Sequence, residues 1–175
     1  EATWKYLLLC SVGIAVALLG TYFLAAAVGP GTGAGTHLTF TGLREAELDP
    51  RWLKAAFLLL LVGYGTKMGL APLHTWLPDA HSEAPSAVSA LLSGALLNCA
   101  FLALLRVQSV CATAGIGEFG RQNFLALGLL SMAVGAGLLI RQPDYKRLLA
   151  YSSVEHMGIL AVGVGLGAGW GVLFH

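Results

Sequence analysis

The stretch VGYGTKMGLAPLHTWLPDAHSEAPS, Val62 to Ser86, places a lysine inside an apolar run and then interrupts that run with prolines. Lys67 follows Trp52 by about 15 residues, which is roughly 22 Å along a helix. A lysine at that depth is costly in hydrocarbon, and a proline inside a helix removes a backbone donor and clashes with the preceding turn. The stretch therefore predicts a membrane helix that breaks just after Lys67.

The composition of the whole chain points to the membrane as well. Of its 175 residues, 57% are hydrophobic and only 11% are charged, whereas soluble domains carry roughly 25% charged residues. The net charge is +1, and no basic cluster extends beyond Lys146 and Arg147, so we do not expect a nucleic-acid partner. The three cysteines show no metal-site or disulfide spacing and are interpreted as packing residues: Cys10, Cys99 and Cys111.

Apolar segments between charged residues predict an all-α integral membrane protein, a polytopic helical bundle in one transmembrane domain over residues 1–175. The expected spans are about 5–27, 52–71 (broken, and continuing to about 79), 85–106, 122–140 and 147–168, with the start of a further helix at 170–175. The charges flanking these spans are too evenly divided to fix the orientation in the membrane. Because the chain lacks an initial methionine and ends within an apolar stretch, we expect an internal fragment of a longer protein.

Small residues at helical spacing predict where these helices pack closely. Gly13 and Ala17 are one such pair, and Ser131 and Gly135 are another. A longer row of small and polar residues shares one face of the third span: Ser86, Ser89, Ser93, Gly94 and Asn98.

Four residues mark the expected helix break: Gly65, Gly69, Pro72 and Pro78. A broken helix at membrane depth is tolerated only where it is buried in protein or faces water. Because desolvation disfavours the charged form of an amine, Lys67 is predicted to exchange protons in a hydrated break. The alternative is an interfacial lysine at the end of an ordinary helix.

Four further polar residues lie in or near the spans and are candidates for a proton pathway. Asn98 can hold water, or it can simply bond a neighbouring helix. Glu155 and His156 are intramembrane ionisable residues, a functional hypothesis by default. For Glu155 the alternative is a capping box with Ser152, and for His156 it is a hydrogen-bonded packing role. His175 ends the chain, so its helical context is cut off.

The remaining ionisable residues around the break do not form a recognisable site. His74, Asp79, His81 and Glu83 have no common metal-ligand spacing, so solvated or loop-capping roles are expected. No nucleotide, haem, iron–sulfur or nucleophile motif occurs. The chain is therefore expected to be non-catalytic itself and to bind no cofactor or metal.

Two long motifs carry a family resemblance. KMGLAPLHTWLPDAHSEAPSAVSALLSG (Lys67–Gly94) and DYKRLLAYSSVEHMGI (Asp144–Ile159) resemble the antiporter-like, proton-translocating membrane subunits of respiratory complex I. That family includes large subunits of multisubunit sodium/proton antiporters and membrane subunits of energy-converting hydrogenases. The variants LLSGALLNC and YSSVEHMG are most similar to the hydrogenase-4 type, found in formate hydrogenlyase-like complexes.

The resemblance implies a complex I antiporter-like repeat of five helices with one broken helix. The spans would be helices six to ten and the start of helix eleven. Lys67 would be the lysine of the first broken helix, and His175 the first histidine of the following relay helix. The glutamate partner on helix five would precede Glu1. Many complex I members have a second lysine where Asn98 stands. Either Asn98 orients water in place of that lysine, or Glu155 or His156 substitutes for it.

The resemblance also implies a function and partners. The leading hypothesis is a proton-pumping subunit of a redox-driven complex in a prokaryotic plasma membrane. Protons would pass by Lys67, water near Asn98, Glu155 or His156, and His175. Other membrane subunits and a peripheral redox module would be the partners, and iron–sulfur, nickel or flavin centres would lie only in them. The alternatives are an antiporter subunit without a redox partner, moving H⁺ or Na⁺, and a structural subunit that no longer transports.

Overall fold

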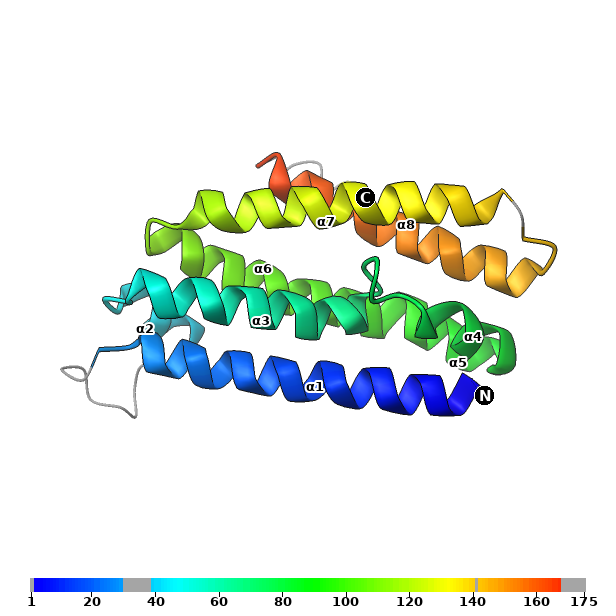
Figure 1. The fold of residues 1–175 in the computed structure, drawn as a ribbon, viewed down its shortest axis with the longest axis horizontal. Coiled ribbons are helices and arrows are strands. Elements are labelled where there is room, and N and C mark those ends of the chain that lie inside the picture. The colour runs from blue at the N-terminus through cyan, green and yellow to red at the C-terminus, as the bar shows by residue number, and fades with distance from the viewer. Residues whose placement is uncertain (1, 30–38, 141, 168–175) are drawn as a thin grey trace.

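The computed structural model describes residues 2–29, 39–140 and 142–167, and in these ranges it is a bundle of helices (Figure 1). The first half contains α1 (Ala2–Ala27), α2 (Phe40–Glu45), α3 (Pro50–Met68) and α4 (Trp76–Glu83). The second half contains α5 (Ser86–Leu91), a π-helical turn η1 (Leu92–Leu96), α6 (Leu97–Thr113), α7 (Gly117–Leu139) and α8 (Tyr145–Gly165). The only β-pairing among the described residues is a single antiparallel bridge between Val28 and Leu48.

The long helices lie side by side along the longest axis of the molecule (Figure 1). α1 packs against α3, α7 packs against α8, and α6 joins the two pairs by contacting both α3 and α7. The short helix α4 lies against α1 and α8. Phe57 of α3 is fully buried, with its ring centroid 6.0 Å from that of Phe124 on α7. The core therefore runs from α3 of one pair to α7 of the other, with α6 contacting both.

Small residues allow the paired helices to approach closely. A Cβ on Gly13 would lie 2.0 Å from the Thr66 hydroxyl, and one on Gly63 would lie 2.5 Å from the backbone nitrogen of Ala17. Between α7 and α8, a Cβ on Gly128 would lie 2.8 Å from the carbonyl oxygen of Gly158. The spacing of Gly13 and Ala17 thus corresponds to a helix–helix contact, as is usual for packing within membranes.

The observed helix ends differ from several expected ones. The span expected at 85–106 continues to Thr113, because Arg106 does not end the helix but places its guanidinium over the ring of Phe40 at 5.5 Å. α7 begins at Gly117 instead of 122, and Glu118 in its first turn pairs with Arg121. α8 begins at Tyr145, since the Asp144 side chain accepts the Lys146 backbone N–H at 3.0 Å and caps the helix. The expected helix at 170–175 lies outside the described residues.

The bundle is an integral membrane structure. Ala2–Ala27, Ser86–Thr113, Gly117–Leu139 and Tyr145–Gly165 are long and apolar enough to cross a bilayer. α3 has 19 residues and carries three cations, and we place it in the membrane because it packs along α1 and α6. Large apolar side chains lie on the outer surface, among them Trp4, Leu8, Tyr22 and Leu91. An apolar outer surface is what contact with lipid requires.

Candidate functional site

The break that follows α3 is built from a glycine in a left-handed conformation. Gly69 has φ 77° and ψ 29°, a combination that side chains disfavour. Its N–H and that of Leu70, the latter at 3.0 Å, both point at the carbonyl oxygen of Gly65. These bonds close the last turn of α3 as in a Schellman-type ending. The chain then passes through a cis Ala71–Pro72 peptide before α4 starts at Trp76.

Side chains from other segments replace the hydrogen bonds that the break removes. The N–H of Ala71 donates to the hydroxyl of Ser131 on α7 at 2.8 Å, and Ser131 is fully buried. The indole N–H of Trp76 donates to the carbonyl oxygen of Thr66 at 2.6 Å. Because a buried backbone group without a partner is costly, these two bonds stabilise a non-helical backbone at this depth.

Lys67 lies in the last turn of α3, directly before the break. Its side chain is half-buried, and its ammonium lies 5.3 Å from the centre of the Tyr6 ring on α1. A cation is favoured both at a helix C-terminus and over an aromatic face. No described ion pair joins the Lys67 ammonium to a carboxylate.

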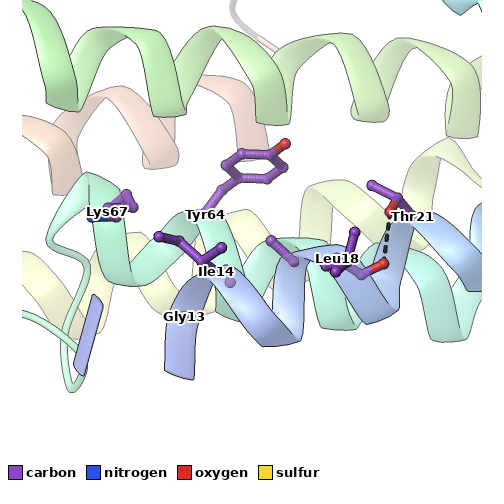
Figure 2. A pocket seen from close by; sticks show the side chains of 8 residues that line it. Gly13, Ile14, Leu18, Thr21, Tyr64 and Lys67 are labelled. Atoms are coloured by element: carbon purple, nitrogen blue, oxygen red, sulfur yellow. Dashed lines mark hydrogen bonds between the residues drawn. The ribbon is translucent and has the colours of Figure 1, made fainter. Parts of the chain in front are cut away.

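A pocket of about 240 Å³ extends from Lys67 between α1 and α3 (Figure 2). Lys67 lies at one end and Thr21 at the other, and most of the lining is apolar. The Thr21 hydroxyl bonds its own helix, donating to the carbonyl oxygen of Leu18 at 2.6 Å. Of the residues that line this pocket, Lys67 is the one with a basic side chain.

The residues expected to make the break have different places in it. Gly69 is the break point and Pro72 lies within the non-helical segment, whereas Gly65 lies inside α3 and accepts the closing hydrogen bonds. The expectation for Pro78 is wrong, since it is buried in the first turn of α4. At that position a helix has no intrahelical partner for the backbone N–H, so a proline is tolerated.

Asn98 and His156 line one pocket of about 230 Å³, together with Ser93, Ser153, Met157 and Leu160. The Ser93 and Ser153 hydroxyls are hydrogen-bonded at 3.0 Å and link η1 to α8. In an α-helix, residues five apart point about 140° away from each other. The π-helical turn Leu92–Leu96 takes up one extra residue and reduces this offset, so Ser93 and Asn98 line the same pocket.

The structure bears on the alternatives considered for Asn98 and Glu155. The Asn98 amide donates to the carbonyl oxygen of Gly94 in its own helix at 2.7 Å, so it does not bond a neighbouring helix through this donor. Glu155 cannot form a capping box with Ser152, because both lie well inside α8. Glu155 lies against α7, where a Cβ added to Gly135 would be 3.3 Å from the Cβ of Glu155. His175 lies outside the described residues.

The sequence did not reveal that two histidines near the break are buried. His74 is 7% exposed and His81 is 5% exposed, against the expectation of solvated or loop-capping side chains. The Nδ1 of His74 and the Nε2 of His81 have no hydrogen-bond partner among the described residues. The His74 ring lies edge-on to Tyr151 of α8, with 6.4 Å between ring centroids. Both imidazoles are therefore candidate members of the site.

The acidic residues near the break are Asp79 in the first turn of α4 and Glu83 at its C-terminal end. Asp79 accepts hydrogen bonds from Lys5 at 2.9 Å and from Arg147 at 3.1 Å, and Glu83 is exposed. Within the part of the chain that the structure describes, no group of three His, Cys, Asp or Glu side chains is placed to hold a metal ion.

Comparison with known proteins places these features in a family. The family model described as NADH:quinone oxidoreductase/Mrp antiporter, TM, matches residues 1–175. The chain is 44% identical over 170 residues to the hydrogenase-4 component F homolog of Methylacidiphilum infernorum, covering 95% of this chain and 36% of that protein. It is 38% identical over 167 residues to NADH-quinone oxidoreductase subunit N of Deinococcus radiodurans, covering 93% and 32%.

Solved structures agree with this assignment. A chain of respiratory complex I from Thermus thermophilus with bound NADH superposes with a TM-score of 0.79 at 29% identity, covering 98% of this chain and 36% of that one. The chain thus spans about a third of the length of the curated relatives it matches. On the match over its whole length, it belongs to the family of NADH:quinone oxidoreductase and Mrp antiporter transmembrane subunits.

Proposed function

We propose that this chain is part of a proton-translocating membrane subunit of a redox-driven complex, and that Lys67 is the group in it that takes up and releases protons. The observation that carries the proposal is the position of Lys67, half-buried in the last turn of a membrane helix directly before a break. A charge is costly at such depth, so an ionisable residue there is a functional candidate by default.

The onward route is proposed to leave the Lys67 pocket through the break. His74 is buried in the break and contacts Tyr151 of α8, the helix that also supplies His156 and Ser153 to the pocket beside Asn98. Imidazoles gain and lose protons near neutral pH, and hydroxyl and amide groups orient water. Protons would therefore move from Lys67 past His74 to His156, with Ser93, Ser153 and Asn98 orienting water there.

Glu155 is placed outside this route because it lies against α7 and not in the Asn98 pocket. His156 would accordingly be the titratable group that takes the place of a second lysine. A role for His175 further along the route remains part of the proposal.

The names of the relatives support the choice of a redox-driven complex. They include a hydrogenase-4 component and a subunit of NADH-quinone oxidoreductase, all from bacteria. We propose other membrane subunits and a peripheral redox module as partners, with redox cofactors only in the partners, in a prokaryotic plasma membrane.

The test is proton uptake into vesicles that contain the full-length protein in its complex. We expect Lys67→Ala to lower uptake at least about tenfold, because proton exchange at this residue is lost. Lys67→Arg is the sharper variant, since a guanidinium keeps the charge but does not deprotonate. It should be as defective as Lys67→Ala. Lys54→Ala is the matched control, because Lys54 lies on α3 away from the break and over Phe119.

Two results would contradict the proposal. Unchanged uptake in Lys67→Ala would remove Lys67 from the mechanism. Full activity of Lys67→Arg would show that a fixed charge is sufficient and that proton exchange at this residue is not needed.

A second candidate is an antiporter subunit without a redox partner, because the matching family also includes Mrp antiporters. Proton uptake that a sodium gradient drives in vesicles lacking any redox subunit would favour it. Uptake that requires electron transfer in a partner would favour the first candidate.

A further inference from the structure

A cluster of charges surrounds Asp79, which lies in the first turn of α4. Each oxygen of the Asp79 carboxylate accepts from a different helix: Oδ2 from Lys5 of α1 at 2.9 Å, and Oδ1 from Arg147 of α8 at 3.1 Å. The Asp79 side chain is 20% exposed, whereas those of Lys5 and Arg147 are 46% and 44% exposed. Isolated surface ion pairs contribute little, but a shared, partly buried carboxylate with two cations is a network.

A third cation, Lys146, contacts the C-terminal end of α4. The ammonium of Lys146 donates to the carbonyl oxygens of Ser82 at 3.4 Å and Ala84 at 3.1 Å. These carbonyls lie at the C-terminal end of α4, where a helix leaves carbonyls unpaired and a positive charge is favourable. Glu83 lines a pocket of about 320 Å³ with Lys5, Asp79 and Arg147.

This external support matters because α4 has only eight residues. A helix of that length is marginal without tertiary contacts, and the break separates α4 from the regular hydrogen bonds of α3. Its position therefore depends on what α1 and α8 provide at its two ends.

One turn of α1 connects the charge cluster with Lys67. Lys5 bonds Asp79, and its neighbour Tyr6 has its ring 5.3 Å from the ring of Trp76 and 5.3 Å from the Lys67 ammonium. Lys5 and Tyr6 of α1 thus contact Asp79 and Trp76, which both lie in the first turn of α4. Tyr6 also contacts the lysine before the break. A displacement of α4 relative to α1 would change the surroundings of Lys67.

We propose that Asp79 is a positioning residue for Lys67: its carboxylate, shared between Lys5 and Arg147, fixes α4 against α1 and α8 and so sets the exposure of Lys67 to water. The proposal rests on the proposed function of Lys67, but its first test does not require transport. It names a residue for which the sequence pattern suggested only a solvated or capping role.

The first test measures how fast residue 67 is labelled. Lys67→Cys is introduced into the full-length protein in its complex, with Cys10, Cys99, Cys111 and the protein's other cysteines replaced by alanine. A membrane-impermeant thiol reagent then reacts from each side. Adding Asp79→Asn should change the labelling rate by about threefold or more, because a small displacement of the supporting groups alters access. Asp79→Glu keeps the charge and should restore the original rate.

Asp144→Asn is the matched control. Asp144 is also a carboxylate next to Arg147, at 4.0 Å, but it contacts neither α1 nor α4 in the described ion pairs. Asparagine also caps helices well, so α8 should be retained. The labelling rate should stay within about twofold of the parent, since an exposed pair of this kind contributes little.

The second test is proton uptake per assembled complex, with Lys67 in place. Asp79→Asn should lower uptake about threefold or more and Asp79→Glu should restore it. An unchanged labelling rate in Asp79→Asn overturns the positioning role, whatever the uptake. If Lys67→Ala leaves uptake unchanged while Asp79→Asn alters labelling, the function proposed for Lys67 fails and the positioning role stands.

Discussion

Two spans of this bundle are interrupted, and they are interrupted differently. After α3 the helix stops at a left-handed glycine, and the chain follows a series of turns, with the Leu73 N–H bonded to the Leu70 carbonyl at 2.8 Å, until α4 begins at Trp76. Between α5 and α6 the helix continues through the π-helical turn Leu92–Leu96. The complete break carries a cationic lysine, while the π-helical turn is followed by the neutral Asn98.

The two interruptions differ in which groups form the hydrogen bonds that a regular helix would have made. At the break, Ser131 of α7 and the indole of Trp76 bond backbone groups that have lost their helical partners. At the π-helical turn the backbone still bonds itself, and the Asn98 amide adds a bond to the Gly94 carbonyl within the same helix. The break is thus stabilised by side chains of other helices, whereas the π-helical turn is stabilised mainly by hydrogen bonds within its own helix.

Removal of the Ser131 hydroxyl should have the largest effect on stability. Ser131→Ala leaves the buried N–H of Ala71 without its partner, so we expect the free energy of unfolding to fall by about 1–3 kcal/mol. The control is Ser109→Ala, because that hydroxyl bonds only the Arg106 carbonyl of its own helix, at 2.7 Å. Denaturant titration of the full-length protein in mixed micelles measures both. Equal effects of the two variants would mean that the break does not depend on α7.

Replacing one glycine by alanine at each interruption should change the free energy of unfolding less than Ser131→Ala does. The two alanine variants should differ from each other. Gly69→Ala forces a side chain into the left-handed region and places its Cβ 3.2 Å from a Leu77 methyl, so we expect a loss of about 1–2 kcal/mol. Gly94→Ala meets no atom within 4 Å and should be neutral or stabilise by up to about 1 kcal/mol. The same denaturant titration applies. A loss in Gly94→Ala as large as in Gly69→Ala would contradict the distinction drawn here.

The smallest effect is expected in the pocket beside the π-helical turn. His156→Gln keeps a polar side chain but no longer titrates, and we expect proton uptake to fall about two- to fivefold. Glu155→Gln, on the neighbouring residue that lies against α7, should lower uptake less. Uptake is measured in vesicles with the full-length protein in its complex. A stronger defect in Glu155→Gln than in His156→Gln would move the route from the Asn98 pocket to the α7 side.

The sequence predicts the break well because its causes are local. Pro72 lacks a backbone donor and Gly69 tolerates a left-handed conformation, and both effects are properties of single residues. The start of α8 was equally local, since Asp144 is a good N-cap. The charged residues Lys146 and Arg147, however, favour a turn at this point, which is why the sequence predicts a span from 147 and not from Tyr145.

The parts that could not be predicted depend on contacts between distant segments. The burial of His74 and His81 results from packing in the folded bundle, including the contact of His74 with Tyr151 of α8, which no local pattern encodes. The partner of the Ala71 N–H lies on α7, and the ion pairs of Asp79 come from α1 and α8. The helix likewise continues past Arg106, whose guanidinium lies over the Phe40 ring of α2.

The π-helical turn also determines on which face of the span the residues of α5 lie relative to those of α6. Ser86, Ser89 and Ser93 follow one another at α-helical spacing, but a regular helix would turn Ser93 about 140° away from Asn98. By taking up one extra residue, the turn reduces this offset, and Ser93, the last hydroxyl of the row, lines the same pocket as Asn98. One residue of added length therefore continues a polar stripe from α5 into α6, in a span whose composition and length are those of an ordinary lipid-crossing helix.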